Sequence, residues 1–444
     1  MSFDLIFQKG IAQGCFSHIW LIPLRFYTRQ LTLVVLLACI HVVMLSFIGT
    51  QKLHAEEISN RVCMALVGHG FENVRVIRQG DYIYASVESN QYRSHVVGIA
   101  HALDILANMS PSGSLIELYV LKRNIPQARV CVPRNIWYEF RHEGSNENVV
   151  ASVLKVSYSA SPSWQQLRDV ASHNPHTFKS DIVLYPQFKA RNVRLSQLYE
   201  VQVNAAPAWE FSLWKGMMFT GQFIIPIVND YEDYYGEGDL ARPGFVSISQ
   251  SFRLLETLFA EVTIGNFNAH RYGGDVKMLW PIISDWLDIQ LQAGITGRSW
   301  FTQRTWHTTA IRTPTWFLKA RHFQPIYNLR FELGFGQFLY GDHAVRADIS
   351  RYFNQTVIGF YAIRSGGEMN GGFHFAVPLP ISSYGYPSLL RIRTPRHFDW
   401  EYNAGTEFTL GQYYESRPNE NRYIHYWNPL FIKNQLLQLK RSEL

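Results

Sequence analysis

The sequence lacks the features that most often identify an enzyme or a nucleic-acid-binding protein. It contains no G-x-x-x-x-G-K-[ST] phosphate loop, no G-x-S-x-G elbow, no H-E-x-x-H zinc motif and no C-x-x-C pair. Charged residues make up only 17% of the chain, and the basic residues behind its net charge of +6 are dispersed along it. Nucleic-acid binding usually needs a clustered basic patch, so no nucleic-acid partner is expected. We likewise expect no catalytic residue and no cofactor.

Long apolar runs are missing beyond the N-terminal region, which excludes a bundle of transmembrane helices. The one long run, Leu31–Ile48, follows Arg25 and Arg29 and precedes Ala55. Basic residues, then an apolar run, then a small residue are typical of a secretory signal, so residues 1–55 are predicted to be a signal peptide. The run is also long enough for an uncleaved signal anchor, which would tether a soluble periplasmic β-protein instead.

Cysteine is scarce, with four residues in the whole chain. Removal of the signal would leave Cys63 and Cys131. These two could form one disulfide in an oxidising periplasm. Two buried free thiols are the alternative.

The C-terminal half is instead rich in alternation between apolar and polar residues. In Ile326–Tyr340, Phe331 and Leu333 fall on one face of an extended strand, and Arg330 and Glu332 fall on the other. The pattern recurs in Val246–Arg253, Thr257–Asn266, Asp275–Trp280, Leu287–Arg298, Val345–Ser350 and Phe373–Leu379, and less regularly in Met217–Ile227, Pro314–Phe323 and Thr356–Arg364.

Segments of about ten residues are long enough to cross a bilayer as tilted strands. Every backbone polar group must be paired in lipid, so such strands have to close on themselves. We therefore predict a mainly β fold, with an antiparallel transmembrane β-barrel of about a dozen strands over residues 195–444. A soluble β-sandwich or barrel also alternates. Aromatic residues near the predicted strand ends favour the membrane, because Trp and Tyr collect at bilayer interfaces; they are Trp214, Trp280, Trp286, Trp300, Trp306, Trp316, Tyr340 and Tyr352.

Residues 56–135 are predicted to form a small periplasmic α/β domain. Its elements have the order α-β-β-α-β-β, read from helical and strand periodicity and from turn residues. Residues 136–194 are expected to be a connecting segment, in which Val150–Ser157 is predicted as a strand, Trp164–Val170 as a short helix and Ile182–Phe188 as a strand. The tail Ile424–Leu444 has a helical pattern.

Six charged residues fall on the predicted lumen face of the barrel. Unpaired charge away from water is costly, so we expect a network of paired charges that lines or plugs the lumen and could hydrogen-bond sugar hydroxyls. Paired carboxylates can also perform glycoside chemistry, which leaves a barrel enzyme acting on glycan or lipid as an alternative. The candidate network comprises Asp288, Arg298, Arg330, Glu332, Arg346 and Asp348.

Metal binding finds little support in the sequence. His173 and His176 have the closest spacing to a ligand pair, but zinc sites need three or four ligands, so no metal is expected. The acidic, aromatic loop Asp230–Asp239 could hold a divalent cation together with an acidic glycan, or could simply be solvated.

Four segments together resemble YjbH-type proteins. They are Leu66 with Gly70-Phe71-Glu72-Asn73-Val74; Leu184-Tyr185-Pro186-Gln187; Gly336-Gln337-Phe338-Leu339-Tyr340-Gly341-Asp342; and Gly371-Gly372-Phe373-His374-Phe375 with Pro378-Leu379-Pro380. The resemblance covers most of the mature chain and is closest to shorter, single-barrel versions. Its motifs consist of Gly, aromatic residues and Pro, so it transfers no catalytic residue.

The resemblance implies a Gram-negative outer-membrane β-barrel associated with exopolysaccharide or capsule biosynthesis and secretion, with its N-terminal domain in the periplasm. It further implies an accessory role. The expected partners are outer-membrane lipid, polysaccharide and periplasmic export proteins. Some members carry a lipoprotein signal, to which Leu36-Leu37-Ala38-Cys39 of this chain bears only a faint likeness.

Overall fold

The computed structural model describes residues 56–144, 146–160, 162–191, 200–231, 235–283, 286–302, 304–385, 389–404, 410–418 and 427–439. The predicted signal peptide, residues 1–55, lies outside the described residues. None of the described helices is both long enough and apolar enough to cross a membrane.

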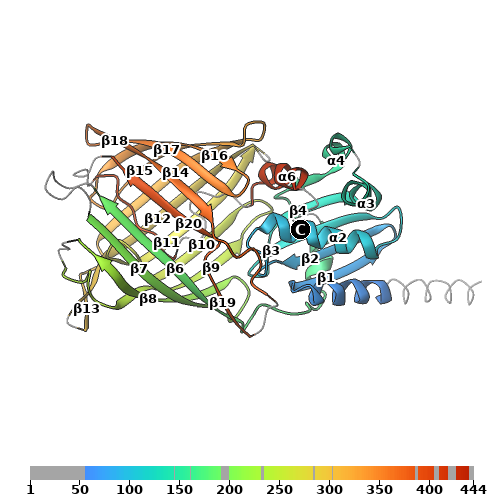
Figure 1. Cartoon of the computed structure of the whole chain (residues 1–444), viewed down its shortest axis with the longest axis horizontal. Coiled ribbons are helices and arrows are strands. Elements are labelled where there is room, and N and C mark those ends of the chain that lie inside the picture. Colours follow the sequence, from blue (N-terminus) through green and yellow to red (C-terminus); the bar gives the residue numbers. More distant parts are fainter. Residues whose placement is uncertain are drawn as a thin grey trace, which may run out of the picture. The chain divides into compact units, whose positions relative to one another are not determined.

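The N-terminal part is a five-stranded sheet covered by helices (Figure 1). Residues 56–68 are helical and are followed by a hairpin of two strands, a helix that crosses over, and a second hairpin. This is the predicted α-β-β-α-β-β order. The crossover places β2 and β3 side by side in parallel, while the other neighbours are antiparallel. The elements are β1 (Glu72–Gln79), β2 (Tyr82–Glu88), α2 (His95–Met109), β3 (Leu115–Lys122), β4 (Ile125–Pro133) and β5 (Lys155–Ser157).

Three short helices, α3 (Arg134–His142), α4 (Glu147–Val153) and α5 (Pro162–Arg168), follow β4. α5 confirms the helix predicted there. The strand predicted over Val150–Ser157 is wrong in its first half, because residues 150–153 belong to α4. The side chain of Asn146 caps this helix by accepting a hydrogen bond from the Asn148 backbone N–H, and Val150 of the helix is fully buried.

The C-terminal part is a single sheet of fifteen strands, of which all but one pair antiparallel with their neighbours. Every segment predicted from alternation overlaps one of these strands. The segment expected to connect the two domains contributes to both sheets, since β5 belongs to the first and β6 to the second. The strands are β6 (Ser180–Arg191), β7 (Glu200–Phe211), β8 (Met217–Asn229), β9 (Arg242–Arg253), β10 (Phe259–Asn266), β11 (Arg271–Ile283), β12 (Leu287–Thr302), β13 (Thr305–Thr308), β14 (Thr313–Gln324), β15 (Leu329–Gln337), β16 (His343–Phe353), β17 (Thr356–Ser365), β18 (Glu368–Pro378), β19 (Leu390–Arg393) and β20 (His397–Asn403).

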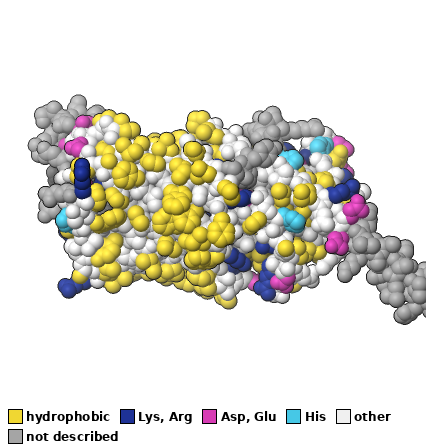
Figure 2. All heavy atoms as spheres, turned by 90° about the horizontal axis from the view of Figure 1, so that it is seen from below, with side chains coloured by type: hydrophobic (Ala, Val, Ile, Leu, Met, Phe, Trp, Pro, Cys, Tyr) yellow, Lys and Arg dark blue, Asp and Glu magenta, His cyan; other side chains and the backbone are white. Residues whose placement is uncertain are grey.

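Alternation in the sequence becomes two distinct surfaces of this sheet. Along β16, exposed and buried residues alternate without a break. Val345 and Ile349 are exposed by 45% and 40%, whereas Arg346 and Asp348 are exposed by only 8% and 7%. Hydrophobic side chains cover the visible outer surface of the sheet, and charged side chains gather at its two ends and on the α/β part (Figure 2). The large sheet therefore has one face of exposed apolar side chains and one face of buried charged side chains.

The two edges of the large sheet meet at one segment that changes partner. Its first half, β19, runs parallel to the start of β6, and its second half, β20, pairs antiparallel with β18. No ladder joins β20 to β6 among the described strands, so hydrogen bonds do not close the sheet. The rings of Phe188 in β6 and Trp400 in β20 nevertheless lie with centroids 5.7 Å apart, so the curled sheet brings its edges into contact.

After β20, part of the chain passes through the interior of the large sheet. In residues 410–418, the Tyr414 hydroxyl donates to Asp275 of β11 over 3.0 Å, and both side chains are at most 2% exposed. The helix α6 (Pro429–Gln438) then contacts both sheets. Its Phe431 packs on Phe323 and Tyr352 of the large sheet, while residues farther along the helix join the core of the α/β part.

Cys63 and Cys131 are both free thiols, so the alternative of a disulfide between them is wrong. Burial raises the pKa of Cys63 to about 11 and that of Cys131 to about 12. The neutral thiol is a poor nucleophile, so both residues should react with iodoacetamide at least about a hundredfold more slowly in the folded protein than after unfolding. Peptide mass mapping reads the two sites separately. Equal labelling rates before and after unfolding would contradict this prediction.

Candidate functional site

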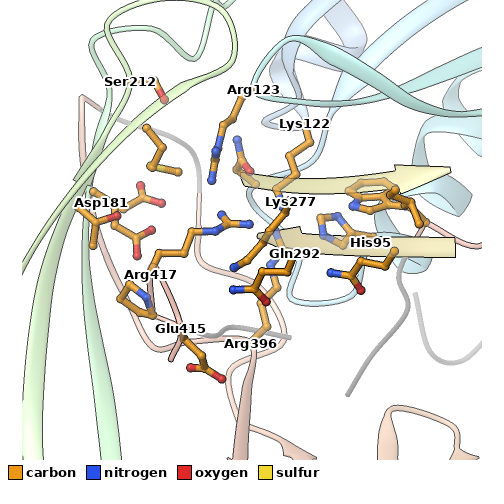
Figure 3. A pocket seen from close by; sticks show the side chains of 18 of the residues that line it. His95, Lys122, Arg123, Asp181, Ser212, Lys277, Gln292, Arg396, Glu415 and Arg417 are labelled. Carbon is orange, nitrogen blue, oxygen red and sulfur yellow. The ribbon is translucent and has the colours of Figure 1, made fainter. Parts of the chain in front are cut away.

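A cavity of about 430 Å³ lies between the α/β part and the interior of the large sheet. Its described lining contains twelve Lys and Arg residues but only seven Asp and Glu residues. Side chains enter it from β3, from β11 and from the segment inside the sheet, as Lys122, Lys277 and Arg417 show (Figure 3). The site is thus a basic, partly enclosed space built by elements far apart in the sequence.

The turn between β3 and β4 positions the first wall of the cavity. Arg123 and Asn124 both have positive φ, 53° and 61°, as the second and third residues of a tight hairpin turn of the primed kind require. Glu88 receives both of their backbone N–H groups, over 2.7 and 2.9 Å. The turn is thereby fixed, and the Arg123 side chain projects towards the large sheet, where it lies 3.3 Å from Glu261 of β10.

Two buried carboxyl groups of the α/β part, Glu88 and Glu72, lie beside the cavity, and their pKa values are shifted in opposite directions. Burial acts to raise the pKa of Glu88, but the nearby His176 and the hydrogen bonds from the turn and from Asn73 outweigh it and lower that pKa. Burial raises the pKa of Glu72, although Arg391 and Lys179 both act to lower it. Glu88 is therefore a firmly ionised structural group, and Glu72 is the easier one to protonate.

The seam of the large sheet forms a second wall. Arg391 of β19 donates to both carboxylate oxygens of Asp181 in β6, each over 2.9 Å. Arg393 donates to Asp181 over 2.9 Å and to Glu210 of β7 over 3.3 Å. The Tyr185 hydroxyl donates to Glu210 over 2.8 Å. Charge-assisted bonds of this kind hold the partner-changing segment to β6 and fix the guanidinium groups at the cavity.

The segment inside the large sheet forms the third wall. Arg417 lies 3.1 Å from Glu261, which it shares with Arg123. Lys277 donates to the Ser416 hydroxyl over 3.1 Å, and that hydroxyl donates to Asp275 over 2.9 Å. The carboxylates therefore hold a group of cations that point into one space (Figure 3).

Five of the six residues predicted to line the lumen do lie on the inner face of the large sheet, in two neighbouring sets of ion pairs. Asp348 is the centre of the first set, with Arg346 at 3.6 Å and Arg330 at 3.9 Å. In the second set, Glu332 pairs with Lys319 at 2.9 Å and Asp288 pairs with Arg321 at 2.6 Å. Each predicted carboxylate has a basic partner.

Arg298 differs from the other five residues because its side chain is exposed and belongs to neither set of ion pairs. In the ladder between β11 and β12 it lies opposite Arg271, near the end of that ladder. After Thr296, β12 leaves β14 and pairs with the short strand β13. The Arg298 backbone N–H then donates to Thr309 in the connection beyond β13. Arg298 thus lies near the point where β12 exchanges β14 for β13, and the prediction that it takes part in the paired lumen network stays a prediction.

Four members of the network were missed from the sequence. His374 is fully buried and lies 2.9 Å from Asp348, and Glu401 pairs with Arg346 at 2.7 Å. Lys319 and Arg321 complete the set. Parity along Pro314–Phe323 places these two with the inward residues, so that signal was present in a less regular run. Glu401 lies in β20, a strand that is not among the segments predicted from alternation.

The other candidates have structural partners. His176 accepts a hydrogen bond from Asn73 over 3.0 Å, and His173 pairs through its backbone with Val74. Within the described ranges no group of three His, Cys, Asp or Glu side chains could hold a metal ion. In the loop Asp230–Asp239, residues 232–234 lie outside the described residues, and Glu237 is buried against Arg242 at 3.2 Å.

Comparison with known proteins identifies one family. The model of the YjbH family, described as exopolysaccharide biosynthesis protein YbjH, matches residues 49–374 and confirms the resemblance. None of the curated proteins matches the chain. Among solved structures, a multiply substituted mutant of the Rh. blastica porin is similar at 8% identity, over 45% of this chain and 87% of that one, with a TM-score of 0.24. A TM-score this low establishes no shared fold.

Proposed function

This chain belongs to the YjbH family of exopolysaccharide biosynthesis proteins, and within that role we propose that it is a non-catalytic outer-membrane β-barrel with a periplasmic α/β domain. It would support the assembly or export of an exopolysaccharide or capsule. The single observation that carries the proposal is the apolar outer surface of the large sheet, which encloses charged side chains. Lipid solvates such a surface, and water does not.

Further features support the membrane location. Most strands of the large sheet have the length of a tilted membrane-crossing strand. Large aromatic side chains are exposed near strand ends, with Trp214 at 54%, Trp286 at 49% and Tyr340 at 55%. Such residues anchor barrels at the two bilayer interfaces. The ring contact between Phe188 of β6 and Trp400 of β20 brings the two edges of the sheet together, as a barrel requires.

The periplasmic location of the α/β part is proposed from its firm attachment to one end of the sheet. The Gly216 backbone N–H donates to the Arg123 carbonyl, and the Arg93 backbone N–H donates to the Ser382 carbonyl, both over 3.0 Å. Arg396 donates to the Arg93 carbonyl over 3.0 Å. A domain held in this way would present partner-docking surfaces beside the lumen.

A non-catalytic role is proposed because the lumen carboxylates are engaged. Glu332, Asp348 and Asp288 each contact at least one basic side chain on the same inner face. A general acid in glycoside hydrolysis must hold a proton and reach the scissile bond, whereas these carboxylates lie in ion pairs with Lys and Arg. Glu332→Gln and Asp348→Asn variants that fold should therefore keep their polysaccharide-related function, whereas loss of function in both folded variants would favour an enzyme.

Deletion of the gene should reduce the polysaccharide released from the cell while the polymer still accumulates inside it. The reason is that an export accessory acts after synthesis. The measurement compares released and cell-associated uronic acid and hexose in the deletion strain, the parent and a complemented strain. Equal release in all three strains would contradict the proposed function.

A further inference from the structure

We infer that the cavity between the α/β part and the interior of the large sheet binds an acidic saccharide, one whose sugar residues carry carboxylate groups. The inference rests on the proposed function and adds the class of polysaccharide to it. The carrying observation is the juxtaposition of Lys122, Lys277 and Arg417 around one space, with an excess of basic over acidic residues in the described lining.

The cations converge from three independent elements. Lys122 ends β3 of the α/β part, Lys277 lies within β11, and Arg417 lies in the segment inside the sheet. Positive charges that converge in a partly enclosed space repel one another, which raises the electrostatic free energy of the protein. The repulsion is stronger where less water is present to screen the charges. A bound anion lowers this free energy, so the arrangement favours an anionic occupant.

Carboxylates behind the lining hold three of its cations in place. Glu261 is shared by Arg123 and Arg417, at 3.3 and 3.1 Å. Lys277 lies 3.8 Å from Asp275, which also accepts hydrogen bonds from Tyr414 and from Ser416. A guanidinium has five N–H donors in a fixed planar arrangement, so it can bind more than one acceptor at a time.

The size and polarity of the cavity favour a saccharide over a small free anion. Its volume of about 430 Å³ is within the usual range for an organic ligand. Neutral hydrogen-bonding side chains line it beside the cations, among them Asn90, Gln290 and Thr220, and Trp427 and Tyr413 offer aromatic surfaces. Amides and hydroxyls bind sugar hydroxyls, and aromatic faces pack on sugar rings, so the lining matches a charged sugar better than a bare ion.

Binding of defined oligosaccharides to the purified full chain in detergent tests the inference. By isothermal titration calorimetry in about 50 mM salt, tetragalacturonate should bind at least about tenfold more tightly than maltotetraose, because only its carboxylates can make charge-assisted hydrogen bonds to the Lys and Arg side chains. Raising the salt concentration should weaken tetragalacturonate binding and leave maltotetraose unchanged. Citrate should bind at least about tenfold more weakly than tetragalacturonate, since it lacks the sugar hydroxyls.

Charge-removing variants locate the site. The double variant Lys122→Gln with Lys277→Gln should bind tetragalacturonate at least about tenfold more weakly than the parent does. Arg61→Gln with Lys155→Gln removes the same charge from exposed positions of the α/β part and should leave binding unchanged. The heat-dependent shift in gel mobility and the circular dichroism spectrum establish that each variant is folded.

Equal affinity for tetragalacturonate and maltotetraose, equal affinity for citrate, or unchanged binding by the folded Lys122/Lys277 variant would each overturn the inference. These failures are distinct from failure of the proposed function. A protein that resides in the outer membrane and is needed for polysaccharide release, yet binds no tetragalacturonate, keeps its function and loses this site. A protein that binds tetragalacturonate, but whose deletion leaves release unchanged, keeps this site and loses the proposed function.

Discussion

Replacing Asp348 by alanine should lower the free energy of unfolding by about 3 to 5 kcal/mol, the largest effect expected of any single change in the large sheet. Asp348 accepts a hydrogen bond from Ser350 over 2.8 Å and contacts His374 over 2.9 Å. Arg330 and Arg346 face the same carboxylate, and Arg330 is only 3% exposed. Removal of the Asp348 carboxylate leaves Arg330 and Arg346 buried with less negative charge to offset theirs.

Urea unfolding in detergent micelles, followed by tryptophan fluorescence, measures this effect. A matched control is Glu368→Ala, in an exposed position at the start of β18, which should change the free energy of unfolding by less than about 0.5 kcal/mol. Adding Arg330→Met to Asp348→Ala should recover part of the loss, because it removes one of the stranded charges. An Asp348→Ala protein as stable as the parent would show that the inner network does not stabilise the sheet.

The second large effect is expected at Glu88, whose replacement by alanine should cost about 3 kcal/mol or more. This carboxylate is 3% exposed and accepts the two backbone N–H groups of the turn that carries Arg123. Without it, two buried donors lose their partner in a turn that already has positive φ. Arg123, at 3% exposure, should then become accessible.

Limited trypsin digestion reads this change directly, as a new cut after Arg123 in the Glu88→Ala protein that is absent from the parent. Glu139→Ala, an exposed position in α3, is the control and should show no new cut. The pKa of Glu88 is lowered in the folded protein, so its contribution is present above the unfolded value of about 4.3 and is lost as the pH falls through the folded pKa. The difference in unfolding free energy between the parent and the Glu88→Ala protein should therefore shrink as the pH falls, and a difference that stays the same from pH 7 into acid would contradict the assignment.

The alternation of apolar and polar residues predicted most of the large sheet. Each strand places its apolar side chains on the outer face and its polar side chains on the inner face. β16 and β17 show this along their whole length. The run over Ile326–Tyr340 was predicted too long. Asn328 has a φ of 52°, in the left-handed region, so it belongs to the turn that joins β14 to β15, and β15 begins at Leu329.

The parts that sequence could not predict depend on contacts between distant residues. Arg391 and Asp181 are far apart in the chain, and their pairing appears only once the sheet has curled. The passage of residues 410–418 through the interior is set by Asp275 and Glu261, not by local propensity. The cavity is formed by this pairing together with residues 410–418, so no single stretch of sequence predicts it.

Whether lipid surrounds the large sheet can be measured on the outer face of β16 in reconstituted lipid vesicles. Spin labels placed by cysteine substitution at Val345, Ala347 and Ile349, with the native cysteines changed to serine, are compared for collision with oxygen and with a water-soluble nickel chelate. We expect high oxygen and low nickel accessibility at all three positions, whereas a label at Ser350, the buried position after Ile349, should show low oxygen accessibility. High nickel accessibility at Val345, Ala347 and Ile349 would mean that this surface faces water, and the outer-membrane role would fall with it.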